Sequence, residues 1–116
     1  MNELLKTEYD KTLRLILESK ESITVGDAYN NAIQINAFLS FFEAHKINAE
    51  INYRNKLIEY EAGEVSHARA ENQAKTTEHY RDYLLFKSLI DRGVEQIRIL
   101  KKFQSGMGQE YQNSNF

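Results

Sequence analysis

The chain of 116 residues contains no proline. About six would be expected at the average usage of ~5%. Because proline removes a backbone N–H and clashes with the preceding turn, it kinks or ends most helices that contain it. Between Asp27 and Phe103 there are also only two glycines, Gly63 and Gly93. Such a chain can stay helical over most of its length, and it therefore predicts long α-helices.

Composition narrows the class of protein. The length is that of a single domain. The net charge of −2 gives the chain as a whole no attraction for nucleic acid. It has no cysteine, which excludes disulfides and thiolate chemistry and fits a reducing compartment. No apolar run approaches the ~20 residues that a membrane-spanning helix needs. We therefore expect a cytoplasmic protein that does not associate with membranes.

The spacing of the apolar residues predicts three helices, over residues 3–20, 25–61 and 66–104. Asn2, Thr24 and Ser66 precede them, and each has a side-chain oxygen that can accept a hydrogen bond from the first turn. The end of the chain is rich in Gly, Asn and Gln and lacks the apolar pattern. We therefore expect one all-α domain over residues 1–104 and a flexible tail over 105–116.

The middle helix is apolar on more than one face. Its core stripe, at helical spacing, is Ala28, Ala32, Ile35, Leu39, Phe42, Ala49 and Tyr53. Further apolar residues stand on other faces of its first half: Ile33, Phe38, Phe41 and Ile47. A helix that is apolar nearly all round must be covered by more than one neighbour. The last helix becomes apolar in its second half, through Tyr83, Phe86, Ile90, Val94, Ile97, Leu100 and Phe103.

A three-helix bundle with a long antiparallel hairpin satisfies these patterns. Folding the second and third helices back around residue 64 places Phe42 near Phe86 and Ile35 near Gly93, so that small residues face large ones. The first helix would cover the apolar end, and a polar two-helix arm would project from it. The alternative is one continuous rod that must dimerise, because a glycine inside a helix costs only ~1 kcal/mol.

Candidate catalytic and metal-binding residues are few. Glu64 and His67 have the Glu-x-x-His spacing of one half of a di-iron site, with Glu61 or Glu71 as the only nearby partners. A complete site needs a second such motif, so solvated charges are the simpler interpretation. His45 and His79 have no nucleophile at a recognisable spacing. We expect no enzymatic activity, no metal and no cofactor.

Tyrosine is the aromatic residue most used here, with seven in the chain. Four of them fall on the predicted arm: Tyr53, Tyr60, Tyr80 and Tyr83. Tyrosine is frequent in interfaces because it combines a large contact area with a polar end. These residues are therefore candidate partner contacts. Alternatively, the rings pack the hairpin where aliphatic residues are scarce.

A basic cluster lies near the end of the third helix and consists of Arg92, Arg98, Lys101 and Lys102. Cations at this end of a helix complement its dipole without any ligand. Nucleic-acid binding is the functional alternative, although it usually needs a broader basic stripe.

The run Ser66 to Glu71, Tyr80 and the run Glu95 to Lys102 resemble small all-helical proteins of tailed phages. The resemblance covers the second half of the chain. It implies the cytosol of a bacterial host as the setting and assigns no site residues.

The function expected from these features is that of a non-enzymatic, helical protein-interaction module, such as a phage accessory protein or a modulator of a host factor. Its partner would be another protein or a second copy of the chain. Two alternatives stay open, a nucleic-acid-binding accessory factor and an oligomeric coiled-coil spacer.

Overall fold

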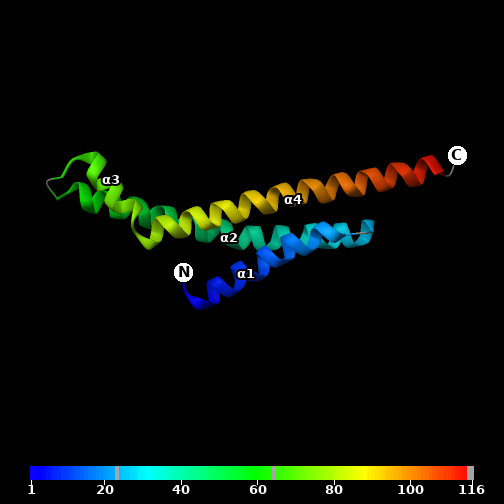
Figure 1. Ribbon diagram of the computed structural model, residues 1–116, viewed down its shortest axis with the longest axis horizontal. Helices are drawn as coiled ribbons and strands as arrows, with labels where there is room; N and C mark the ends of the chain where they lie inside the picture. The colour runs from blue at the N-terminus through cyan, green and yellow to red at the C-terminus, as the bar shows by residue number, and fades with distance from the viewer. Residues whose placement is uncertain (23, 64, 115–116) are drawn as a thin grey trace.

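The computed structural model describes residues 1–22, 24–63 and 65–114, with side chains through residue 106. It confirms an all-α fold built on a helical hairpin (Figure 1). The elements are α1 (Glu3–Glu18), a 3-10 turn (Ser19–Glu21), α2 (Val25–Glu61), α3 (His67–Lys75) and α4 (Glu78–Ser114). The molecule is elongated and measures 74 × 27 × 17 Å.

The predicted N-caps are all present. The side chains of Asn2, Thr24 and Ser66 each accept a hydrogen bond from the backbone N–H three residues on, at 2.8, 3.0 and 3.2 Å. Each cap satisfies one of the N–H groups that a first helical turn leaves without a partner. These local signals explain why α1, α2 and α3 begin where the sequence predicts.

Helices α2 and α4 run alongside each other, which excludes the continuous rod (Figure 1). The rings of Phe42 and Phe86 lie 5.4 Å apart between centroids, and both side chains are buried, as predicted. The residue that most closely faces Gly93 is Leu39, one turn from the predicted Ile35. Small residues therefore do face large ones across the hairpin, with a register shifted by one turn at this point.

The inner face of α4 differs from the prediction at one position. Val94 was expected in the core, yet it is about half-exposed. Gly93 makes the close approach to α2, and each residue of a helix is rotated by about 100° from the one before it. Val94 is therefore turned out of the core, whereas Leu89 and Gln96 are buried.

The predicted third helix is interrupted at Thr76 and Thr77. Their hydroxyls donate to the carbonyls of Gln73 and Ala74 at 2.7 Å, and their backbone N–H groups bond to the same two carbonyls. These three-residue bonds replace the four-residue bonds of an α-helix. The prediction of a single helix over 66–104 was therefore wrong. The threonine hydroxyls compete for the backbone carbonyls whose hydrogen bonds would otherwise continue the helix.

Breaking the helix lets α3 lie against the end of α2. Ala70 and Ala74 are fully buried there, because only small side chains permit this close approach. At its other end α4 remains helical to Ser114, beyond the predicted end near residue 104. The part of the expected flexible tail over 115–116 lies outside the described residues.

Helix α1 covers one side of the hairpin. Its Tyr9 ring packs edge-on against Phe42 at 6.2 Å. The amino group of Met1 contacts Glu78 and lies 3.2 Å from Asp82, both at the start of α4. The hydrogen bond to Glu78 raises the pKa of this amino group and lowers the pKa of Glu78. Both ends of α1 are thus fixed, by these charges and by the turn into α2.

Candidate functional site

Three of the four predicted tyrosines meet between α2 and α4. Tyr53 lies 4.8 Å from Tyr80, and Tyr80 lies 6.5 Å from Tyr83, measured between ring centroids. All three side chains are half-buried, and so is Tyr60, which stands further along α2. The contact between Tyr53 and Tyr80, whose rings are tilted by 41°, joins the two helices where aliphatic side chains are scarce. This arrangement matches the packing role, and it leaves only part of each ring for a partner.

The four predicted basic residues lie on two different surfaces. Arg98, Lys101 and Lys102 line a shallow depression on the second half of α4. Arg92 instead lines a groove between α1 and α4. Arg98 also pairs with Glu95 at 3.1 Å on the same helix. The structure therefore brings together three of the four cations and neutralises part of their charge.

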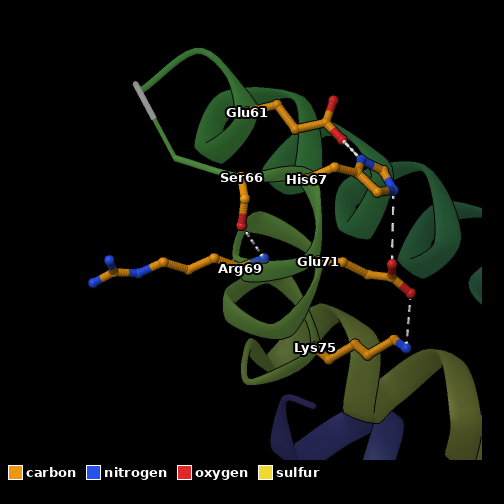
Figure 2. Close-up of polar contacts among 6 residues, drawn as sticks. All are labelled: Glu61, Ser66, His67, Arg69, Glu71 and Lys75. Atoms are coloured by element: carbon orange, nitrogen blue, oxygen red, sulfur yellow. Dashed lines mark hydrogen bonds and ion pairs between the residues drawn. The ribbon is translucent and has the colours of Figure 1, made fainter.

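The end of the hairpin carries a chain of charged side chains (Figure 2). The Nδ1 atom of His67 contacts Glu61 Oε1 at the end of α2, and its Nε2 atom lies 3.7 Å from Glu71 Oε2. Glu71 accepts a hydrogen bond from Lys75 at 2.9 Å. This bond lowers the pKa of Glu71 and raises the pKa of Lys75. The chain links α3 to α2 through exposed groups, whose individual energies are small.

The arrangement of this cluster does not support the metal hypothesis. Glu64 lies outside the described residues. In the part of the chain that the structure describes, no three His, Asp or Glu side chains are arranged to hold a metal ion. The ring of His45 lies 4.5 Å from that of Phe41 and 6.1 Å from that of Phe86, so this histidine has a packing role.

A groove runs along one side of the hairpin, and its walls come from α2 and α4. It consists of two adjoining cavities of about 290 Å³ each, which share Asn36 and Ile97. One is lined by Asn36, Leu39, Ser40, Glu43, Ile90, Val94 and Ile97, and the other by Tyr29, Ala32, Ile33, Asn36, Ile97, Lys101 and Gln104. We call this continuous depression the α2–α4 groove.

Large apolar side chains are exposed along the α2–α4 groove. Tyr29 is 56% exposed, Ile33 is 51% exposed and Val94 is 48% exposed. Polar groups occupy its ends, with Glu43 at one end and Lys101 at the other. An apolar floor with charged ends is the usual arrangement of a surface that binds another polypeptide.

A second apolar feature continues from this groove along α2. Residues at alternating spacings of four and three form a stripe on the exposed side of the helix: Ile33, Ala37, Ser40, Ala44, Ile47, Ile51, Arg54 and Ile58. Its isoleucines are 50–63% exposed. This spacing is the heptad pattern of helices that pack in coiled coils. We call this set the α2 stripe.

Sequence reasoning contained a signal for this surface but did not select it as a site. The apolar residues on several faces of α2 predicted more than one covering neighbour. Helices α4 and α1 cover the core stripe, while Ile33, Phe41 and Ile47 remain exposed. Three of the four apolar residues outside the core stripe are therefore left uncovered by α1 and α4, whereas the fourth, Phe38, is half-buried.

The fold places the chain in the class of all-α proteins built on a long helical hairpin with one covering helix. No family model matches the chain, and neither a curated protein nor a solved structure matches it. Within the described residues, none of the helices combines the length and apolar character required to cross a membrane.

Proposed function

We propose that the protein is a non-enzymatic, helical protein-interaction module that binds its partner through the α2–α4 groove and the α2 stripe. The observation that carries the proposal is the exposure of Ile33 and Ile47, on a helix that is apolar on more than one face and is covered by α1 and α4 on the others. The partner is helical, since a groove between two helices and a heptad stripe both accept a helix. The resemblance to small phage proteins would make the module an accessory protein or a modulator of a host factor.

The tyrosines have a supporting role in this proposal. Tyr53, Tyr80 and Tyr83 hold the two long helices in register. The groove and the stripe run along those helices, so the packed rings preserve the shape of the surface that the partner contacts. Tyr60 remains a candidate for direct contact at the end of α2.

Photo-cross-linking tests the proposed function. A photoreactive amino acid replaces Ile33 or Val94 in separate variants expressed in cells, and the same residue replaces exposed Arg14 on α1 as the control. We expect Ile33 and Val94 to give discrete cross-links to a polypeptide, of whatever identity, and Arg14 to give none. Absence of polypeptide cross-links from both groove positions would reject the proposal.

The basic depression favours one other candidate function, nucleic-acid binding through Arg98, Lys101 and Lys102. Binding of that kind depends steeply on salt because it releases counterions. A gel shift with single- and double-stranded DNA and RNA at low salt would detect it. No shift at low salt removes this candidate.

A further inference from the structure

We infer that the partner is a second copy of this chain, whose α2 packs antiparallel against the α2 stripe about a two-fold axis near residues 45 and 46. This inference rests on the proposed function, because it names the occupant of the same surface. A two-fold axis uses one surface twice, so every contact below occurs in two identical sets.

The sizes of the residues along the α2 stripe favour the antiparallel direction. The first half of the stripe is mostly small, with Ala37, Ser40 and Ala44, and the second half is large, with Ile47, Ile51 and Arg54. Antiparallel pairing about residues 45 and 46 places each small residue opposite a large one. Ala44 then faces Ile47 of the second copy, and Ser40 faces its Ile51. Interdigitation of this kind is what closely packed helices require.

A parallel arrangement of the two α2 helices would pack the same stripe less well. It would place Ala37, Ser40 and Ala44 opposite the same small residues of the second copy. The first half of the interface would then contain gaps while the second half was crowded. Loosely packed layers lose the dispersion contacts that stabilise such an interface.

Charge at the ends of the groove is also complementary in the antiparallel arrangement. Lys101 of α4 and Tyr29 of α2 line the same cavity, so the basic part of α4 is level with the start of α2. The second copy places the end of its own α2 at this level, with its Glu59 and Glu61. Its last turn contains no basic residue and adds the negative end of the helix dipole. Glu59 and Glu61 are already paired with Lys56 and His67 of their own chain, and Arg98 is paired with Glu95. The attraction therefore comes mainly from Lys101 and the helix dipole.

Acidic residues beside the stripe do not oppose this pairing. Glu43 and Glu50 flank the α2 stripe, so in the dimer they would approach Glu43 and Glu50 of the second copy. Each is already paired with a cation of its own helix: Glu43 lies 3.8 Å from Lys46, and Glu50 lies 2.9 Å from Arg54. From Ala28 to Phe42 the helix has no charged side chain at all. The interface therefore contains little unbalanced charge.

The available area is sufficient for a stable dimer. From Tyr29 to Ile58 the helix extends about 44 Å, at 1.5 Å per residue. Two packed helices present a face about 20 Å wide, so the surface is on the order of 900 Å² per copy. Specific protein interfaces bury about 800 Å² per partner. One α2–α4 face per copy is therefore enough.

The oligomeric state is the first test. Sedimentation or light scattering over a range of micromolar concentrations should give twice the chain mass of 13.6 kDa. Ile47→Glu places a charge at the centre of the stripe, and because Ile47 is exposed the fold is unaffected; this variant should have the mass of one chain. Leu4→Glu, at an exposed position on α1, is the matched control and should remain a dimer. A monomeric wild type overturns the inference, as does a dimeric Ile47→Glu.

The direction of pairing is the second test, and the absence of native cysteine makes it direct. Single-cysteine variants are treated with a short thiol-to-thiol cross-linker. Ala44→Cys lies near the axis and should form a covalent dimer. Ile33→Cys should not, because its two copies are about 38 Å apart at 1.5 Å per residue. A mixture of Ile33→Cys and Ile58→Cys should cross-link. Cross-linking of Ile33→Cys to itself would overturn the antiparallel arrangement.

These tests separate the inference from the proposed function. If the purified chain is monomeric, but the photoreactive residue at Ile33 captures a different polypeptide, the dimer is rejected and the interaction module is retained. If Ile33 and Val94 capture no polypeptide at all, both are rejected. Capture of a second copy, together with a double mass, supports both.

Discussion

Leu39 occupies the space that any side chain at position 93 would need. A Cβ atom built on Gly93 would lie 2.5 Å from one terminal methyl carbon of Leu39 and 2.8 Å from the other. Leu39 is itself buried in the core, so its side chain has little freedom to move aside. The long hairpin therefore depends on one glycine at a point where α2 and α4 approach each other closely.

Overpacking at position 93 costs about 1–3 kcal/mol, and the better helix propensity of alanine offsets about 1 kcal/mol of this cost. Gly93→Ala should therefore lower the free energy of unfolding by up to about 2 kcal/mol. Urea unfolding followed by circular dichroism measures the difference. Gly106→Ala is the control: its Cβ would meet no atom within 4 Å, so this variant should be more stable than the wild type. Equal effects of the two substitutions would contradict the close approach.

The Phe42–Phe86 pair is the centre of the core. Phe42→Ala or Phe86→Ala should each cost about 3–5 kcal/mol, the usual cost of removing a buried aromatic ring. Phe41, adjacent to Phe42 but 44% exposed, is the matched control, and Phe41→Ala should cost less than half as much. Thermal and urea unfolding provide the comparison. An unchanged melting temperature for either core variant would disagree with the observed packing.

Gln96 is buried, and its Nε2 atom has no hydrogen-bond partner among the described residues. A buried donor without a partner costs about 1–3 kcal/mol. Gln96→Leu keeps the volume and removes the donor, so it should raise the free energy of unfolding by about that amount. Gln96→Ala removes the donor too but leaves a cavity, and it should gain nothing. A lower stability of Gln96→Leu would show that the amide has a partner in solution.

Most of the fold could be predicted because it depends on local signals. Asn2, Thr24 and Ser66 mark helix starts by a bond to a backbone N–H three residues on. The core stripe of α2 is fully periodic and was buried as expected, apart from half-buried Tyr53. The break at Thr76 and Thr77 was missed, because threonine is tolerated inside helices and its hydroxyl bonds depend on α3 being held against α2.

The candidate site could be predicted only in part. Ile33 and Ile47 were visible as apolar positions on a second face, but which of them α1 would cover depends on how α1 crosses the hairpin. Val94 shows the same limit, since a shift of one turn at Leu39 and Gly93 decides that it points outwards. The tyrosines were found by composition, whereas the contact between Tyr53 and Tyr80 depends on the register of two helices that are distant in sequence.

Glu71 provides a test of the charged cluster on α3. Its hydrogen bond with Lys75 stabilises the ionised carboxylate and holds the pKa of Glu71 below its ordinary value of 4.5. The contribution of this pair to folding is therefore present above pH 4.5 and is lost as the pH falls through the lowered pKa.

A carboxyl-carbon NMR titration should give a midpoint for Glu71 below 4.5, and Lys75→Gln should move this midpoint back upwards. High salt should move it in the same direction, because the pair is exposed and screened. Lys11→Gln, which removes the partner of Glu8 instead, should leave the Glu71 midpoint unchanged. If neither Lys75→Gln nor high salt changes the titration midpoint of Glu71, the contact with Lys75 does not persist in solution.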